Sequence, residues 1–239
     1  MSVFVIADLH LSTADALKSM EVFGSRWKDY HNKIKNNWNK LISPDDTVVI
    51  PGDISWALTC QDALSDIKFI DSLSGKKIIM KGNHDFWWTS VTKMKNMFEE
   101  NEIKTIEILN NNALEVEKYI ITGSRGWFID PSSQTKSVNA DFDKVNNREV
   151  IRLKIGLDEA KKLQDISPEK EIVTFFHFPP YWGEFKNSKI INMLCEYGVK
   201  RCYFGHIHGN YNISSSFTVD NIEMRLISAD YLNFIPLFV

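Results

Sequence analysis

The sequence predicts an α/β fold in which helices pack against buried sheets. Short apolar, β-branched runs alternate with longer segments whose apolar residues recur at helical spacing. Hydrophobic residues make up 44% of the chain, a fraction typical of soluble globular proteins with a substantial core. Polar motifs stand where predicted strands end, which is where ligand sites form in open α/β sheets. A length of 239 residues leads us to expect one domain spanning residues 1–239.

The first half of the chain alternates strictly between strand and helix patterns. The predicted strands, each bounded by turn signals, are 3–7, 47–50 and 77–80. The predicted amphipathic helices are 26–41, 59–73 and 90–101. This order favours parallel strands joined by helices, because a crossover connection of this length brings the next strand back in the same direction.

The second half begins with short strand patterns and then returns to alternation. The predicted strands are 106–109, 114–116, 119–122, 171–176, 199–204, 217–219 and 223–228. The predicted helices are 146–166 and 190–197. Residues 123–143 are interpreted as a long polar loop, and loops this long in compact domains are often functional lids.

Charge and cysteine content narrow the class of protein. The 28 basic and 31 acidic residues give a net charge of −3, which argues against an extended nucleic-acid track. Cys60, Cys195 and Cys202 are too few and too scattered for a disulfide framework. No apolar run reaches the length of a membrane span, and the first apolar run is too short for a signal peptide. We therefore expect a cytoplasmic protein without a membrane partner, while the oligomeric state stays unknown.

Five of the six histidines lie in one ordered set of short motifs. The motifs are Asp8-Leu9-His10, Gly52-Asp53, Gly82-Asn83-His84-Asp85, His177 and Gly205-His206-Ile207-His208. Each motif follows a predicted strand, so the side chains are expected to gather at one edge of the fold. One histidine at a strand end is usually a hydrogen-bonded structural residue. Five polar motifs at the carboxyl ends of five predicted strands are not expected if each residue has only a structural role.

The residue types in this set are those of a two-metal hydrolytic site. Oxygen donors are mixed with imidazole and no thiolate is present. Residues two apart in an extended segment point to the same side, so Asp8 and His10 can reach one cavity. Asp53, directly after a glycine at a strand end, is well placed to bridge two cations. The Asn83 carbonyl would add a bond without adding negative charge.

The ordered set, from residue 8 to residue 208, resembles the calcineurin-like metallophosphoesterase superfamily. Segments 51–56, 81–88 and 123–127 look similar to an uncharacterised bacterial branch of predicted phosphohydrolases. The resemblance implies a four-layer αββα sandwich of two mixed β-sheets flanked by helices. It implies a reaction class but brings no substrate.

The resemblance also implies a role for each motif residue. The implied ligands are Asp8, His10 and His208 for one metal, Asn83, His177 and His206 for the other, and Asp53 as the bridge. His84 would contact the phosphate and protonate the leaving oxygen, while Asp85 would hold the His84 ring. Manganese or iron would be the first candidates for the two ions, with zinc, cobalt or nickel as alternatives.

Several residues outside the ligand set are candidates for substrate binding. Arg125 could bind a phosphate through a bidentate pair of N–H groups, or equally form an ordinary loop salt bridge. Trp87, Trp88 and Trp127 could line a pocket for a flat group, although such tryptophans more often anchor cores and loops.

These observations predict a dinuclear metal-dependent phosphoric ester hydrolase. A metal-activated hydroxide would attack phosphorus in line in a phosphomonoester or phosphodiester, from a small molecule or nucleotide. One alternative is a nuclease or phosphoprotein phosphatase with the same centre. Another is a metal-binding scaffold without catalysis, which would typically have lost ligands or the acid–base histidine that this chain retains.

Overall fold

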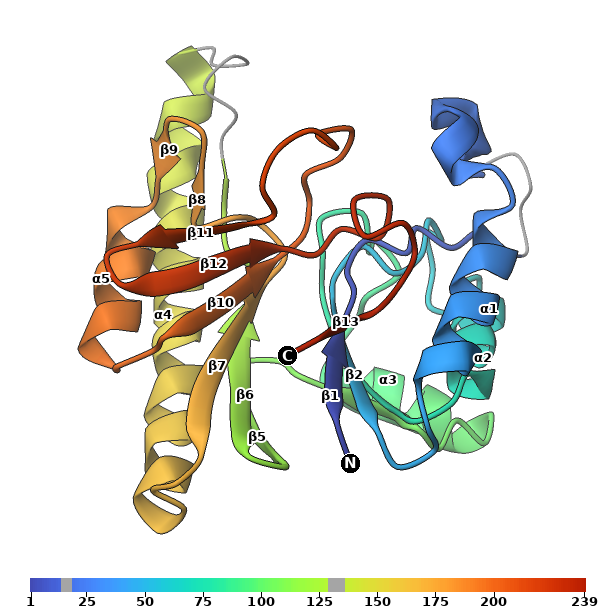
Figure 1. Cartoon of the computed structure of the whole chain (residues 1–239), viewed down its shortest axis with the longest axis horizontal. Helices are drawn as coiled ribbons and strands as arrows, with labels where there is room; N and C mark the ends of the chain where they lie inside the picture. Colours follow the sequence, from blue (N-terminus) through green and yellow to red (C-terminus); the bar gives the residue numbers. More distant parts are fainter. Residues whose placement is uncertain (14–18, 129–135) are drawn as a thin grey trace.

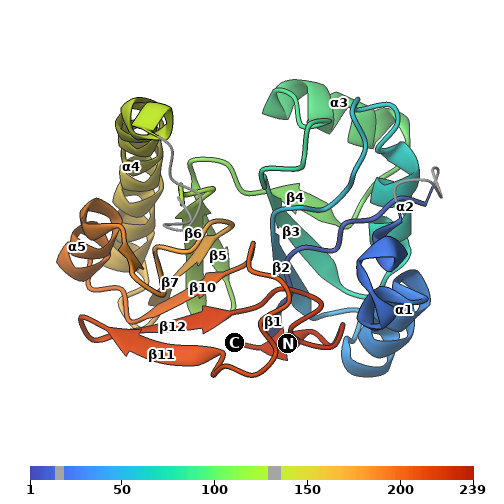
Figure 2. The same ribbon diagram turned by 90° about the horizontal axis from the view of Figure 1, so that it is seen from above.

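Two β-sheets face each other, and helices cover their outer faces (Figure 1). The computed structural model describes residues 1–13, 19–128 and 136–239, with the side chains of 136–142 set aside. Seen from above, the order of layers is helix, sheet, sheet, helix (Figure 2). The predicted four-layer αββα sandwich is therefore confirmed.

The first sheet contains five strands in the order β13-β1-β2-β3-β4. Its strands are β1 (Val3–Val5), β2 (Thr47–Pro51), β3 (Lys76–Met80), β4 (Ile106–Ile108) and β13 (Leu237–Phe238). Strands β1 to β4 are parallel to their neighbours, and β13 pairs antiparallel with β1. The helices α1 (Tyr30–Leu41), α2 (Leu64–Ser72) and α3 (Val91–Glu100) cover its outer face (Figure 2).

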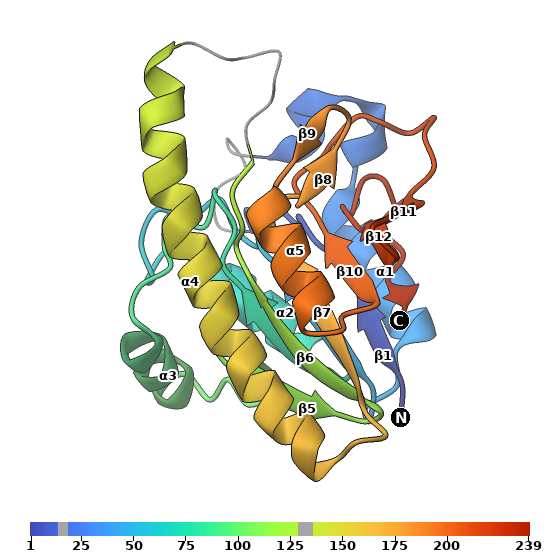
Figure 3. The same ribbon diagram turned by 90° about the vertical axis from the view of Figure 1, so that its left-hand side faces the viewer.

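The second sheet contains six strands in the order β11-β12-β10-β7-β6-β5. Its strands are β5 (Ala113–Val116), β6 (Tyr119–Ser124), β7 (Glu171–Phe176), β10 (Arg201–Phe204), β11 (Ser216–Val219) and β12 (Ile222–Leu226). The four central strands are parallel and the two edge strands antiparallel, so the sheet is mixed. The helices α4 (Lys136–Ile166) and α5 (Ser188–Glu196) pack on its outer face (Figure 3).

Successive residues of each strand contribute to different apolar layers because side chains alternate across a sheet. In β1, Val3 and Val5 join the cluster shared by the two sheets, whereas Phe4 joins the cluster beneath the helices of the first sheet. In β7, Val173 and Phe175 face the other sheet, and Ile172 packs in the cluster with α4 and α5. Burial on both faces explains why these strands are mostly apolar in the sequence.

Two predicted helices begin later than expected. The helix predicted at 26–41 starts at Tyr30, after a 3-10 turn at Ser25–Trp27. Asp29, between them, has a φ of 54°, and this left-handed conformation interrupts a right-handed helix. The helix predicted at 59–73 starts at Leu64, because the residues before it form turns.

The predicted loop at 123–143 is wrong at both ends. Strand β6 continues through Ser124, and α4 already begins at Lys136 rather than at 146. The start of α4 rises beyond the ends of the strands (Figure 3). A helical segment that extends beyond a sheet does not need an apolar face. The polar sequence of such a segment therefore has the same pattern as a polar loop. Residues 129–135 of the expected lid lie outside the described part of the chain.

Several two-residue strands were not predicted. They are β8 (Tyr181–Trp182), β9 (Phe185–Lys186) and β13, which are too short to show a period. Among the residues that the structure describes, no helix is both long and apolar enough to cross a membrane.

Candidate metal centre

The predicted motif residues converge at the carboxyl ends of the parallel strands, where the two sheets adjoin. The first sheet supplies Asp8 and His10 after β1, Asp53 after β2, and Asn83 after β3. The second sheet supplies His177 after β7 and His206 and His208 after β10. The chain therefore assembles these donors from two separate layers.

Asp8, His10 and His208 form a first candidate ligand group, whose donor atoms all lie within 4.8 Å of one another. The Nε2 atoms of His10 and His208 are 3.2 Å apart. His208 donates from Nδ1 to Asp230 Oδ1 at 2.8 Å, which fixes its tautomer and leaves Nε2 to face the site.

Asp53, His177 and His206 form a second group with the same 4.8 Å spread of donor atoms. His177 Nε2 lies 2.6 Å from Asn83 Oδ1 and 3.5 Å from Asp53 Oδ2. The same Asp53 oxygen is 3.7 Å from His10 Nε2 of the first group. Asp53 therefore stands between the two groups.

Several buried atoms in this cluster have unmet bonding capacity that suits cations. In the described part of the chain, Asp8 Oδ1, His10 Nδ1 and His177 Nδ1 are buried without a hydrogen-bond partner. Buried polar atoms without partners are rare in proteins and call for an explanation such as an ion. Carboxylate and imidazole donors fit divalent transition metals, so the residues present fit a pair of such ions.

The electrostatics of the cluster lead to the same conclusion. Burial raises the pKa of Asp8 to about 6. Burial, with the nearby carboxylates of Asp85 and Asp8, raises the pKa of Asp53 to about 9. Burial and neighbouring imidazoles lower the pKa of His10 and His177 well below the ordinary range. Bound cations would reverse the penalty on the carboxylates and favour the neutral imidazoles, which is the donor state that metals need.

The backbone of the ligand loops is strained. Asp8, His10, Asp53 and His206 all have positive φ values, of 60°, 46°, 50° and 71°. Each such conformation costs about 1–3 kcal/mol in a residue other than glycine, and such strain is found mostly at functional sites. Here it turns the side chains sharply from the strand ends into the shared site.

The glycines of the motifs leave room for the carboxylates. An added Cβ at Gly205 would lie 2.5 Å from Asp8 Oδ2, an atom that accepts a hydrogen bond from the His206 backbone at 2.8 Å. An added Cβ at Gly82 would overlap Asp53 Oδ1. At both positions the close approach of a carboxylate leaves no space for a side chain.

His84 stands at the edge of the cluster with a half-buried ring. Its backbone N–H donates to Asp53 Oδ1 at 2.8 Å, and its ring centre is 4.3 Å from that of Trp56 and 5.7 Å from that of His10. Burial and the charge of His208 lower its pKa. The ring is therefore close to the candidate ligands without belonging to either group.

Asp85 has a different contact from the one expected. It is fully buried and accepts hydrogen bonds from the backbone of Ile54, Ser55 and Gly82 and from Trp87 Nε1. A bond to the His84 ring is not among its hydrogen bonds in the described part of the chain. Asp85 thus joins the loop after β2 to the loop after β3, which contains His84.

The candidate substrate residues have different surroundings. Arg125 is half-buried, with Nη2 3.9 Å from Glu149 Oε1. Trp127 is half-buried, and its ring lies 5.4 Å from the Arg125 guanidinium. Trp87 is buried, and its Nε1 donates a hydrogen bond to Asp85. Its neighbour Trp88 lines a cavity.

Two residues at the site were not predicted. Asp230 is buried and accepts from His208, from the Gly209 backbone and from the Tyr211 hydroxyl. Its only signal in the sequence was an acidic residue shortly after a predicted strand. Trp56 stacks on His10, with ring centres 4.9 Å apart, and its place in the 51–56 motif was the available signal.

Comparisons with known proteins add four findings. A family model described as calcineurin-like phosphoesterase matches residues 1–210. The uncharacterized protein MJ1445 of Methanocaldococcus jannaschii is 24% identical over 158 residues, which cover 62% of this chain and 85% of that protein. The crystal structure of TT1561 of Thermus thermophilus matches with a TM-score of 0.52 and 7% identity, covering 96% of this chain and 89% of that one. A crystal structure of AQ665 from Aquifex aeolicus, described as a protein of unknown function, has a TM-score of 0.46 and 14% identity, over 99% of this chain and 95% of that one.

Proposed function

The chain belongs to the calcineurin-like phosphoesterase family, and from this premise we propose that it is a dinuclear metal-dependent phosphoric ester hydrolase. The observation that carries the proposal is the pair of ligand groups with Asp53 between them, 3.7 Å from His10 Nε2 and 3.5 Å from His177 Nε2. Asp8 Oδ1 supports it, because this atom is buried without a hydrogen bond and lies 3.4 Å from His177 Nδ1. We further propose that residues 1–239 act as one domain, because both sheets contribute donors.

The proposed ligands are Asp8, His10 and His208 for one ion, Asn83, His177 and His206 for the other, and Asp53 as the shared ligand. Two cations, when bound, supply positive charge to the phosphoryl oxygens and make water a better nucleophile near neutral pH. Mixed nitrogen and oxygen donors suit manganese or iron as first candidates, with zinc, cobalt or nickel as alternatives. Asp230 holds the His208 ring in the orientation that presents Nε2.

His84 is the residue that we propose as general acid. Its half-buried ring is beside the ligand groups, and the bond from its backbone N–H to Asp53 Oδ1 fixes its position relative to the proposed bridge. The ring would contact a phosphoryl oxygen and pass a proton to the leaving oxygen. Although burial lowers the pKa of His84, the negative charge of a bound phosphate acts in the opposite direction.

A small phosphoester or nucleotide is the proposed substrate class. The net charge of −3 disfavours a long nucleic-acid track. Arg125 and Trp127 are proposed to contact the substrate near the centre, because both are half-buried and lie together.

The experiment that tests this function is hydrolysis of p-nitrophenyl phosphate and bis-p-nitrophenyl phosphate by the protein loaded with manganese. We expect turnover that a chelator abolishes and manganese restores. A preference for one ester would separate monoester from diester chemistry. A protein that holds two ions yet hydrolyses neither ester, nor other phosphoesters with any of the five metals, would refute the proposed activity.

A further inference from the structure

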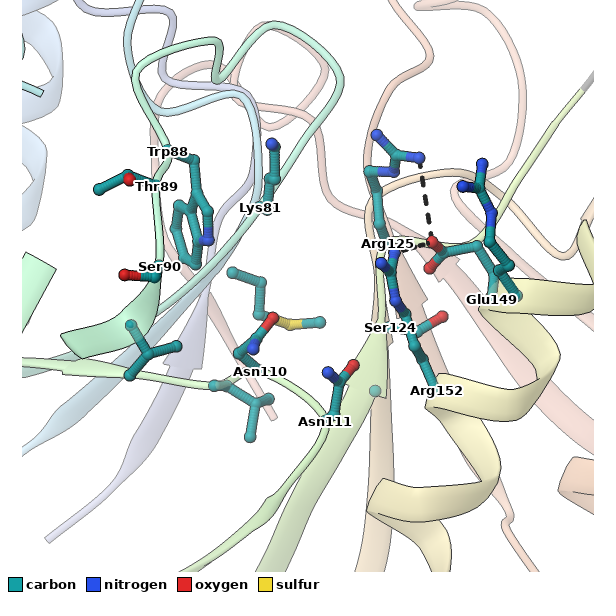
Figure 4. A pocket seen from close by; sticks show the side chains of 15 residues that line it. Lys81, Trp88, Thr89, Ser90, Asn110, Asn111, Ser124, Arg125, Glu149 and Arg152 are labelled. Atoms are coloured by element: carbon teal, nitrogen blue, oxygen red, sulfur yellow. Dashed lines mark hydrogen bonds and ion pairs between the residues drawn. The ribbon is translucent and has the colours of Figure 1, made fainter. Parts of the chain in front are cut away.

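A cavity of about 530 Å³ lies beside the candidate metal centre, between the two halves of the sandwich (Figure 4). Lys81, Trp88 and Ser90 form the wall on the side of the first sheet. Arg125 and residues of α4 form the opposite wall, and Figure 4 shows the two walls facing each other. The residues that line this cavity include none of the proposed metal ligands, so it is a separate space next to the centre.

The charge of the lining is strongly positive although the chain as a whole is acidic. Among the residues that the structure describes, the charged lining residues are Lys81, Arg125, Arg148 and Arg152, with Glu149 as the single acid. The local balance is thus four positive charges against one negative charge, whereas the whole chain has a net charge of −3. A concave surface of one sign concentrates ligands of the other sign.

Glu149 organises these cations but does not neutralise them. Its side chain is buried, with 1% exposed, and Oε1 accepts from Arg152 Nη1 at 2.6 Å. The same oxygen lies 3.9 Å from Arg125 Nη2. In the part of the chain that the structure describes, Glu149 Oε2 and Arg125 Nε are buried without a partner. Within the described ranges, one carboxylate thus holds two guanidinium groups near each other and engages only part of their N–H donors.

The crowding of cations has an electrostatic consequence. Burial lowers the pKa of Arg125, and the nearby Arg152 and Arg148 lower it further, while Glu149 acts against them. Repulsion among the arginines therefore persists in the cavity. An anion placed between them would relieve this repulsion and form charge-assisted, bidentate hydrogen bonds.

The rest of the lining fits an anion attached to an organic group. Helix α3 begins at the cavity, with Ser90 as its N-cap, and the N-terminus of a helix favours negative charge. Trp88 is half-buried on the same wall and offers an apolar ring (Figure 4). Asn110 and Asn111 add amide donors.

The cavity is close enough to the centre for one ligand to use both. Lys81 is two residues before Asn83, on the same loop after β3. The Arg125 carbonyl accepts a hydrogen bond from the backbone of Phe178 at 2.8 Å, directly after His177. The charge of Asp53 also acts on Arg125 and raises its pKa. The two sites are therefore neighbours through two different loops.

We propose that this cavity binds a second phosphate group of the substrate. The substrate is then an organic compound with two phosphates: one is hydrolysed at the metal centre, and the other is held by Lys81, Arg125 and Arg152. This inference rests on the proposed function and deepens it by naming the substrate class. Arg152 is a positioning and specificity residue in this scheme, because it touches the phosphate that does not react.

Anion binding can be measured without turnover. We would load the protein with zinc, titrate it with inorganic sulfate, and follow the arginine Nε–H signals by NMR. The signals of Arg125 and Arg152 should shift together and saturate, and the Arg125 shift should be lost in Arg152→Gln. The matched control is Lys162→Gln, an exposed site on the same helix with the same loss of charge. Arginine signals that ignore sulfate, or an unchanged Arg125 response in Arg152→Gln, would overturn the anion site.

The substrate class is tested with pairs that differ by one phosphate. We would compare kcat/KM for adenosine 3′,5′-bisphosphate with its two monophosphates, and for fructose 1,6-bisphosphate with fructose 6-phosphate. A bisphosphate should be preferred by at least about tenfold, and Arg152→Gln should reduce this preference by about tenfold, the effect of one charged hydrogen bond. Lys162→Gln should keep it. Equal use of mono- and bisphosphates, or a preference that survives Arg152→Gln, would refute the proposal.

The two experiments separate the inference from the function on which it rests. If no phosphoester is hydrolysed but sulfate binds through Arg152, the proposed activity fails and the anion site stands. If the simple aryl esters are hydrolysed but sulfate does not bind, the activity stands and the second phosphate site fails.

Discussion

Asp53 connects more of the site than any other side chain in the described part of the chain. One of its oxygens lies near a histidine of each ligand group, and the other accepts from the backbone of His84. Its pKa, raised to about 9, reflects burial near other carboxylates. A residue with these surroundings is destabilising when ionised alone and favourable only when cations share it.

The first prediction concerns this residue. Asp53→Asn keeps the shape of the side chain but removes its charge. Metal affinity and turnover should both fall by at least about a hundredfold, because substitution of a residue that only supports a metal ligand already costs up to about a hundredfold. Metal content by mass spectrometry and phosphate release measure the two effects. Asp46→Asn is the control, because Asp46 is also buried and hydrogen-bonded but binds the backbone of Ser2 and Ser43. Two metals per chain in Asp53→Asn would contradict the bridging role.

Substitution of His84 should lower the rate without lowering metal binding, whereas substitution of Asp53 should lower both. His84→Ala should retain both ions, since its ring is in neither ligand group, and lose about 10²–10⁴-fold in rate. The loss should grow as the leaving group becomes more basic. His31→Gln is the control, because His31 is the histidine outside the motifs and interacts with the Ser12 backbone. An unchanged rate for a poor leaving group would eliminate the general-acid role.

At the scale of elements, the strand ends determine the site more than the strands themselves do. The proposed ligands lie in the loops directly beyond β1, β2, β3, β7 and β10, several of them in the left-handed conformation. These turns are tight because glycines allow neighbouring loops to touch. The loops therefore have little freedom to relax around a substitution.

A glycine substitution tests this packing. Gly205→Ala should displace Asp8, whose Oδ2 would be 2.5 Å from the new Cβ, and cost about 1–3 kcal/mol of stability by overpacking. Metal content should fall with it. Gly198→Ala should cost a similar amount, about 1–2 kcal/mol, through its φ of 72°, but it meets no atoms within 4 Å and should leave the metals bound. Full metal content in Gly205→Ala would show that the loop can move.

The elements also show what the sequence could and could not predict. Strand β7 was predicted with its observed bounds, because continuous apolar residues buried on both faces leave a clear pattern. The start of α4 was missed because a polar helix and a polar loop have similar composition. The arginine-lined cavity was also missed, since Lys81, Arg125 and Arg152 come from three segments that only the tertiary arrangement brings together.

At the scale of the whole molecule, the proposed ligand set is divided between the two sheets. Asp8, His10, Asp53 and Asn83 follow strands of one sheet, and the three remaining histidines follow strands of the other. Bound cations would therefore link the layers directly, in addition to the apolar cluster between them. Stability should depend on metal, because a ligand that binds only the folded state stabilises it.

Removal of metal should lower the melting temperature, and more at about pH 8.5 than at about pH 7. In the metal-free folded protein the pKa of Asp53 is about 9, whereas its ordinary value is 3.8. Between these two values the folded state holds a proton that the unfolded state has lost, so the free energy of unfolding decreases as pH rises. His10 and His177, with lowered pKa values, are neutral in both states above about 6.5 and do not offset this. Lys77, whose pKa is about 8, titrates in the same way with and without metal. Its contribution to stability therefore cancels when the metal-bound and metal-free proteins are compared.

Thermal melts with and without a chelator at both pH values measure this dependence. In the loaded protein the cations already hold Asp53 ionised, so the loss is absent. In the metal-free Asp53→Asn variant, the decrease in melting temperature that we attribute to Asp53 between the two pH values should be absent. A difference in melting temperature that shrinks as pH rises would contradict the assignment.

The division of the donors between the sheets has a consequence for biosynthesis. A ribosome completes the segment with Asp8, His10, Asp53 and Asn83 long before it adds His177 and the final histidine pair. The nascent chain therefore presents four of the seven proposed ligands and could not hold both proposed ions in the final arrangement. Ions bound at the proposed centre would be acquired after translation has passed residue 208, and the metal composition of the mature protein would then follow the ions present where folding ends rather than where synthesis begins.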